Sequence, residues 1–497
     1  MNTTTTNTFF GHPRGLATLF FTEFFERFSY YGMRALLVLF LTAPLAQGGM
    51  GVEAKTASTI YGICTGAVYL FSLPGGWLAD RLFGQQRMII VGGGFIALGN
   101  LLLAVPVTQA FYLGLVSIVI GTGCLKSNIS AVVGELYRND TGTRRDAGFS
   151  IFYMGINSGA FLAPFIAGTI GEIFNFRIGF ATAGIAMLIG LAQFKATAHH
   201  LHGAGTHPAQ TEPTLKARDH KLFLGGVALG VALLILTLTG MISINPGMLA
   251  TIMEFGSVVL AVGFFGGILI GGNLTGDERR RIYVIMAFFI ASMLFWAGFE
   301  QAGSTLNFFA RDLTDRSLFG GWFAEGVHPA TWYQSVNPIY IIVLSPVFAA
   351  LWMRLGAKNL DPSAPLKMAY GLILLGIGFG VLMIASQLIL SQGGKAGPQW
   401  LLLAYLFHTC GELCLSPIGL SNITKLAPQR FAGQLMGTWF LGTAIGNLIA
   451  GLVGGDIASE VQGMPGKFLE IALVGVVAGL LMLAASSRLR RWMGSHA

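Results

Sequence analysis

The sequence predicts an all-α integral membrane protein with fourteen transmembrane helices. Hydrophobic residues occupy 54% of the 497 positions, charged residues only 10%, and the mean hydropathy is +0.67. Soluble domains carry about 25% charged residues, which excludes that class. Fourteen apolar segments are long enough to cross a hydrocarbon core roughly 30 Å thick. They are expected at residues 16–42, 56–79, 88–105, 109–133, 147–171, 176–194, 221–241, 248–270, 281–308, 331–353, 368–390, 399–426, 431–454 and 468–487.

The positions of the 30 lysines and arginines predict how these helices are oriented. Cytoplasmic loops carry an excess of such residues, and most of them here fall on the side that holds both chain ends. The opposite side holds only Lys55, Arg177, Arg311, Arg316, Lys395 and Lys467. We therefore expect a multi-pass protein of the cytoplasmic (inner) membrane with both termini in the cytoplasm. The polar start does not match a cleavable signal peptide, so the first helix is expected to remain.

A polar stretch at 196–220 divides the helices into two groups. The six helices before it predict an N-terminal bundle, residues 1–195. Residues 222–270 contain no lysine or arginine, so we interpret 196–280 as a cytoplasmic linker with two accessory transmembrane helices. Residues 281–497 then form a C-terminal six-helix bundle. This order is typical of a major-facilitator fold with an inserted pair, in which two halves rock around a midplane site.

The first helix carries an unusual group of charges. Its polar face is expected to contain Glu23, Arg27, Tyr30 and Arg34, with Glu26 and Tyr31 beside it. A charge at the bilayer centre costs roughly 2.5 to 3.5 kcal/mol on insertion scales, so this face must contact protein or water. It is either an internal clamp that holds the bundle together or part of a site for charged cargo.

Other polar residues lie within apolar segments, chiefly Lys126, Glu300, Asn337 and Glu412. An isolated lysine in lipid would lose its proton and an isolated glutamate would keep its own. Each therefore ionises only beside an opposite charge, which predicts a common polar cavity. The glutamates are candidate proton carriers, because an approaching or departing cation changes their affinity for a proton.

The loop after the second helix reads Gly75-Gly-Trp-Leu-Ala-Asp80-Arg81 and resembles the cytoplasmic loop signature of the major facilitator superfamily. In that superfamily the acid and the bases latch the inward gate. An ordinary positive-inside turn would explain the arginines but not Asp80 beside Arg81.

Two further motifs resemble signatures of the proton-dependent oligopeptide transporters. They are Glu23-x-x-Glu26-Arg27-Phe28-x-Tyr30-Tyr31-Gly32 and Phe152-Tyr153-x-x-Ile156-Asn157-x-Gly159. The likeness continues through Tyr69, Lys126 and residues 299–301, 334–338 and 411–421. It covers both halves, and bacterial members of that family also carry an inserted helix pair.

The resemblance implies a proton-coupled symporter that imports di- and tripeptides by alternating access. In this family the cations matching Arg27 and Lys126 meet the peptide carboxylate, and the acid matching Glu412 meets its ammonium. The implied substrate-binding residues are Arg27, Tyr30, Tyr31, Arg34, Tyr69, Lys126, Asn157, Trp296, Glu300, Asn337, Glu412, Ser416 and Trp439. Proton coupling is assigned to Glu23, Glu26, Arg27 and Lys126, and likeness to a family pair suggests an ion bridge between Arg34 and Glu300.

One position departs from the family pattern. Eukaryotic members carry a histidine in the second helix that helps proton coupling, and the surrounding alignment places Gly62 there. Coupling must then rest on carboxylates. His408, one turn before Glu412, either assists or is a hydrogen-bonded packing residue.

Other function classes fit less well. No spacing suits a catalytic nucleophile and base or a metal set, so we expect no enzyme, no cofactor and no metal. A cluster of opposite charges obstructs a channel. The alternative is a carrier of the same fold for another small anion or zwitterion, such as nitrate or a peptide-like drug. The expected partners are di- and tripeptides, protons and the lipid bilayer, with no nucleic acid, and the protein is expected to be a monomer.

Overall fold

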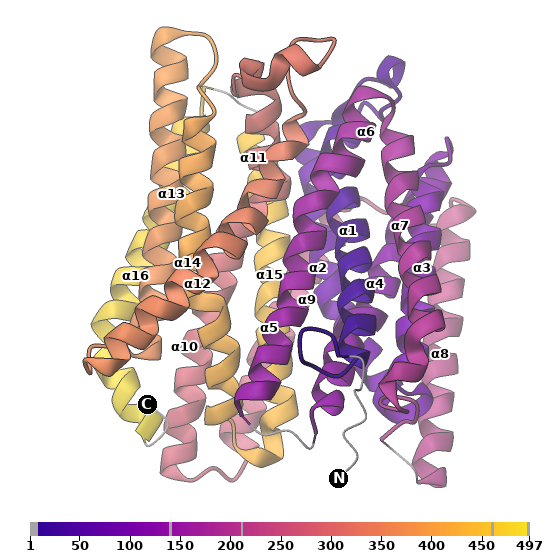
Figure 1. Cartoon of the computed structure of the whole chain (residues 1–497), viewed down its shortest axis with the longest axis vertical. Coiled ribbons are helices and arrows are strands. Elements are labelled where there is room, and N and C mark those ends of the chain that lie inside the picture. Colours follow the sequence, from indigo (N-terminus) through magenta and orange to yellow (C-terminus); the bar gives the residue numbers. More distant parts are fainter. Residues whose placement is uncertain (1–7, 139–141, 210–211, 459–461, 495–497) are drawn as a thin grey trace. The chain divides into compact units, whose positions relative to one another are not determined.

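The computed structural model describes residues 8–138, 142–209, 212–458 and 462–494, which are almost entirely helical (Figure 1). Within these ranges thirteen helices, some continued by short 3-10 or π-helical turns, are long and apolar enough to cross a membrane. α1 (Gly15–Thr42) is a further helix of 28 residues, distinguished by the charges at its centre. The predicted all-α membrane fold is confirmed.

The chain divides into two compact units, and the first comprises Met1–Leu36 and Ala67–Asn245. It holds most of α1 and the second half of α2 (Ala54–Leu78). Its other helices are α3 (Gln85–Leu103), α4 (Thr108–Leu136), α5 (Thr143–Ala163), α6 (Thr169–Ile173), α7 (Phe176–Thr197) and α8 (Pro213–Leu238). α3 packs against both α4 and α7. Large apolar side chains such as Ile96, Phe152 and Phe194 fill the core of this unit.

The second unit comprises Leu37–Gly66 and Pro246–Ala497. Besides the end of α1 and the first half of α2, it holds α9 (Pro246–Gly271), α10 (Gly276–Phe299), α11 (Thr305–Phe308), α12 (Val336–Ala357), α13 (Ala364–Gln392), α14 (Gln399–Leu426), α15 (Ala432–Ala458) and α16 (Met464–Met493). α13 packs against α14 and α16, and α10 packs against α15. α12 crosses this unit obliquely in Figure 1 and contacts α14.

Most helices differ from their predicted bounds by a few residues, and two differences have a clear physical reason. α8 begins at Pro213 rather than near residue 221, because proline suits the first helical turn, where its missing N–H has no intrahelical partner anyway. The predicted helix 281–308 is interrupted by a 3-10 turn at Glu300–Gly303. At that turn Tyr61 of α2 lies directly over Gly303, where an added Cβ would sit 2.2 Å from the tyrosine hydroxyl. The packing of another helix therefore accompanies this break.

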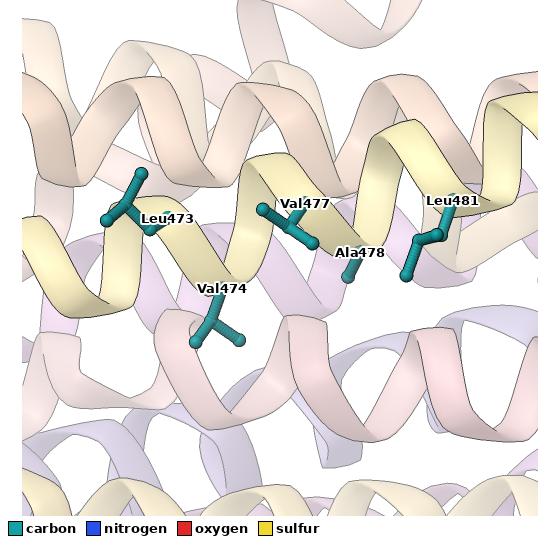
Figure 2. A pocket seen from close by; sticks show the side chains of 5 residues that line it. All are labelled: Leu473, Val474, Val477, Ala478 and Leu481. Atoms are coloured by element: carbon teal, nitrogen blue, oxygen red, sulfur yellow. The ribbon is translucent and has the colours of Figure 1, made fainter.

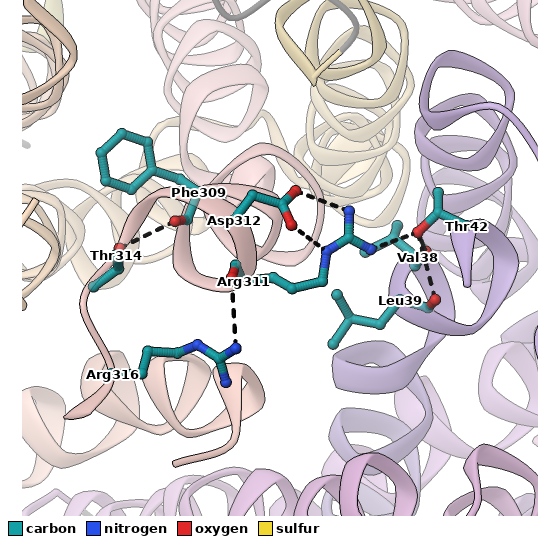
Figure 3. Close-up of polar contacts among 8 residues, drawn as sticks. All are labelled: Val38, Leu39, Thr42, Phe309, Arg311, Asp312, Thr314 and Arg316. Carbon is teal, nitrogen blue, oxygen red and sulfur yellow. Dashed lines mark hydrogen bonds and ion pairs between the residues drawn. The ribbon is translucent and has the colours of Figure 1, made fainter. Parts of the chain in front are cut away.

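A polar contact joins the end of α1 to the π-helical turn Phe309–Leu313 after α11 (Figure 3). Arg311 donates from Nη1 to Oγ1 of Thr42 at 2.8 Å and binds both carboxylate oxygens of Asp312 at 2.7 and 2.8 Å. Nη2 of Arg316 donates to the carbonyl of Arg311 at 3.5 Å. The end of α1 is thereby hydrogen-bonded within the second unit, which agrees with the division of this helix between the two units.

Candidate functional site

The charged centre of α1 is a buried ion cluster. Glu23, Glu26 and Arg27 are 3%, 0% and 5% exposed. Arg27 pairs with both oxygens of Glu26, through Nη2 at 2.6 Å and through Nε, and Nε also lies 3.3 Å from Oε1 of Glu23. Removing one member of a buried pair typically costs about 3 to 5 kcal/mol, because the remaining charge stays desolvated. To avoid an unpaired buried charge, the cluster needs all its members or a charged ligand that replaces one of them.

Close packing of α2 on α4 places a second cation in the same unit. A Cβ at Gly75 would lie 2.3 Å from the carbonyl oxygen of Gly123, and Asn128 donates from Nδ2 to the carbonyl of Gly75 at 3.2 Å. At this contact Nζ of Lys126 lies 3.8 Å from the ring centroid of Tyr69. A cation is attracted to the face of an aromatic ring, so Tyr69 stabilises the ammonium at this position.

The second sequence motif packs α5 onto the charged part of α1. A Cβ at Gly159 would lie 2.3 Å from the carbonyl oxygen of Phe24 and 3.1 Å from Cβ of Arg27, so only glycine permits this approach. Asn157, two residues earlier, is buried and donates from Nδ2 to the carbonyl of Tyr153 at 3.0 Å. One N–H of the amide is thus bound within its own helix, and the second N–H and Oδ1 are the groups that can contact a ligand.

Aromatic rings flank the arginines of α1. The guanidinium carbon of Arg27 lies 5.0 Å from the ring centroid of Tyr30, and that of Arg34 lies 5.3 Å from the ring centroid of Tyr31. The two tyrosine rings are nearly perpendicular, with centroids 5.4 Å apart. The first unit therefore combines Arg27, Arg34 and Lys126 with three tyrosines, and we call this group the cationic half-site.

The second unit carries a hydrogen-bonded acidic group on α12 and α14. Nδ2 of Asn337 donates to Oε2 of Glu412 at 2.9 Å and to Oγ1 of Thr409 at 3.0 Å. Thr409 lies almost one turn before Glu412 on α14, and Ser416 lies one turn after it. The sequence motifs predicted Asn337, Glu412 and Ser416 but did not include Thr409. Its spacing of three residues from Glu412, which places both on one face of the helix, could have indicated it. We call Asn337, Thr409 and Glu412 the acidic half-site.

The remaining residues expected from the sequence lie on α10 and α15. Glu300 is buried at the end of α10 and accepts from the hydroxyl of Tyr61 at 3.3 Å, a partner that the sequence motifs did not indicate. Trp296 packs edge-on against Phe299, with ring centroids 5.2 Å apart. Trp439 is buried against Gly419, where a Cβ would lie 2.0 Å from its ring. This close packing favours a structural role for Trp439.

Gly62 has no room for a side chain. A Cβ there would lie 2.6 Å from Cα of Gly451, so α2 and α15 approach each other backbone to backbone. A histidine at this position would separate the two helices. His408 is also buried, and its ring packs on Phe379 with centroids 4.8 Å apart. The structure therefore leaves no space for a side chain at position 62, and the expected role of the carboxylates stays a prediction.

The first unit also contains a buried acid that contacts the loop after α2. Asp219 of α8 is 1% exposed, and Oδ2 lies 3.7 Å from Nη1 of Arg81. The ring of Phe83 packs edge-on against Phe223 of the same helix at 5.4 Å. The accessory helix is therefore held to the loop by charge and by aromatic packing. The gate role of Asp80 and Arg81 stays a prediction.

A surface groove on α16 has a different character (Figure 2). It is lined by Leu473, Val474, Val477, Ala478 and Leu481. None of these side chains can pair with a charge, and the four larger ones are at least half exposed. The groove suits lipid chains and is unsuited to a zwitterion.

Comparisons with known proteins agree with this geometry. A model of the POT family matches residues 86–212 and 266–464. The peptide transporter YePEPT of Yersinia enterocolitica is 39% identical, over 99% of this chain and 98% of its own length. A di-/tripeptide transporter of Lactococcus lactis is 35% identical, over 99% and 98%. A crystal structure of a peptide transporter POT in complex with sulfate matches with a TM-score of 0.90 and 38% identity, covering 98% of this chain and 97% of that one.

Proposed function

Because this chain belongs to the POT family of membrane transporters, we propose that it imports di- and tripeptides together with protons. The observation that carries the proposal is the opposite charge of the two half-sites. Arg27 and Lys126 lie in the cationic half-site, and Glu412 lies in the acidic one. A short peptide has a fixed negative charge at one end and a fixed positive charge at the other. If charged residues bind the two termini through ion pairs, one site can accept peptides with many different side chains.

The composition of the α1 cluster supports proton coupling. Glu23 and Glu26 balance Arg27 and Lys126 when all four are ionised, and Lys126 acts electrostatically on Glu23. A proton on one glutamate leaves one positive charge uncompensated. The carboxylate of the peptide would then supply the missing negative charge, so proton and peptide each favour binding of the other. Release of the proton restores the internal ion pairs and weakens the peptide site.

The same proposal places the protein in the cytoplasmic membrane with both termini in the cytoplasm. The bundles at residues 1–195 and 281–497 would alternate access to the site, which requires no covalent chemistry. Each chain carries both half-sites, so a monomer is sufficient for transport.

Uptake of labelled dialanine into proteoliposomes tests this function. An imposed inward proton gradient should drive accumulation above the external concentration, and an uncoupler should abolish it. Glu412→Gln should weaken binding of dialanine much more than binding of N-propionyl-alanine, which lacks the amino group. Absence of dialanine uptake, or nitrate uptake under the same gradient, would favour the alternative carrier. Accumulation that survives the uncoupler would refute proton coupling.

A further inference from the structure

Thr409 is a fully buried hydroxyl at the base of the acidic half-site. It is 0% exposed. Oγ1 donates to the carbonyl of Tyr405 at 2.7 Å and accepts from Nδ2 of Asn337 at 3.0 Å. The same Nδ2 donates to Oε2 of Glu412 at 2.9 Å. The result is a continuous chain of hydrogen bonds from the backbone of α14 through α12 to the carboxylate.

The direction of this chain follows from the number of hydrogens available. A threonine hydroxyl has one hydrogen, and here the carbonyl of Tyr405 receives it. Towards Asn337 the oxygen of Thr409 can therefore only accept. An ionised Glu412 is likewise only an acceptor. Both neighbours require the NH₂ group of Asn337, and a rotated amide would place Oδ1 against two acceptors.

This orientation decides what Asn337 offers to a ligand. Both N–H bonds of its amide are used, so Oδ1 is the polar atom that remains to accept a hydrogen bond. An ammonium group carries three donors and needs several acceptors around it. With Glu412 alone, the amide would have a single neighbour to fix its orientation, and a protonated Glu412 could donate its O–H to Oδ1 of the rotated amide. Thr409 therefore selects the amide orientation that suits a positively charged amino terminus.

We propose that Thr409 is a positioning residue for recognition of the free amino terminus, acting through Asn337 and Glu412. This inference rests on the proposed peptide transport and adds a residue to its specificity. It predicts that the hydroxyl of Thr409, rather than the volume of its side chain, determines how strongly a free amino group contributes to binding.

The test compares two ligands on matched variants by calorimetric titration of the purified protein. Dialanine has the amino group and N-propionyl-alanine lacks it. Thr409→Val removes the hydroxyl at nearly constant volume, and Thr409→Ser keeps it. Thr59→Val is the control, because Thr59 is also buried and donates to the carbonyl four residues earlier, at 2.9 Å. Should the valine variant not fold, Thr409→Ala takes its place.

We expect Thr409→Val to weaken dialanine binding by about three- to tenfold, the effect of one lost neutral hydrogen bond. Binding of N-propionyl-alanine should be unchanged, and Thr409→Ser and Thr59→Val should bind dialanine like the parent. Equal losses for both ligands, equal losses in the valine and serine variants, or no loss in Thr409→Val would overturn the inference. Failure of the parent to bind dialanine would instead refute the proposed function.

Discussion

Replacing Gly159 by alanine is expected to disrupt the cationic half-site by separating α5 from α1. The new Cβ would lie 2.3 Å from the carbonyl oxygen of Phe24 and 3.1 Å from Cβ of Arg27. Neither atom can rotate away, because one belongs to the helix backbone and the other is bonded directly to it. The helices must therefore move apart at the level of the ion cluster.

The size of this effect follows from contact distances. Close carbon–oxygen contacts between helices lie at about 3.3 to 3.6 Å, so α5 must shift by about 1 Å. Overpacking of a packed interior typically costs about 1 to 3 kcal/mol. A loss of only about 1.4 kcal/mol in binding corresponds to about tenfold in affinity. We therefore expect Gly159→Ala to bind dialanine about tenfold more weakly and to be less stable than the parent.

Gly94→Ala is the matched control for Gly159→Ala. Gly94 lies inside α3, and a Cβ there would meet no atom within 4 Å. Alanine is favoured over glycine in a helix by about 1 kcal/mol, so this variant should be at least as stable as the parent and should bind normally. Calorimetric titration with dialanine and thermal unfolding of the purified proteins measure both quantities. Parental affinity and stability in Gly159→Ala would refute the role of this close contact.

Three further predictions test proton coupling, the ion bridge between Arg34 and Glu300, and the accessory helix. Glu23→Gln imitates permanent protonation, so it should abolish gradient-driven accumulation of dialanine in proteoliposomes yet retain peptide counterflow; unchanged accumulation would reduce the cluster to a structural clamp. Arg34→Ala and Glu300→Ala should each impair transport, and the charge-swapped double variant should recover part of it; strict additivity in that cycle would argue against an ion bridge. Asp219→Asn removes the buried charge that faces Arg81, so it should lower stability by about 1 kcal/mol in thermal unfolding without changing dialanine affinity; parental stability would show that the pair does not hold α8.

Most of the fold could be predicted from the sequence because membrane helices follow a simple rule. In lipid, each transmembrane helix must form its backbone hydrogen bonds internally, and each helix needs about 20 apolar residues to cross the membrane. The helix break at Glu300–Gly303 was not predictable in this way. It occurs where Tyr61, more than two hundred residues earlier in the sequence, packs over Gly303. A contact between distant segments leaves no periodic signal in either of them.

The candidate site could be predicted only in part for a related reason. A charge such as Glu23 or Lys126 in an apolar segment is costly, so it is visible in the sequence as an exception. Threonine is ordinary in such segments, where its hydroxyl usually bonds to its own helix. Thr409 makes that usual bond, and what distinguishes it is the amide of Asn337 from another helix. The partner, rather than the residue type, gives this hydroxyl its proposed role.

The packing at Gly62 also limits how this protein can couple protons to transport. A side chain there would push α2 away from α15, since its Cβ would lie 2.6 Å from Cα of Gly451. A histidine therefore cannot be introduced at that position without moving a helix. The carboxylates of α1 are instead already held in place by Arg27. It follows that Gly62→His should impair folding rather than add a coupling group. Glu23→Gln keeps the Arg27–Glu26 pair, so it should still fold, with lower stability, and should lose the coupling. Comparing the yield of folded protein with gradient-driven uptake for these two variants separates packing from proton chemistry.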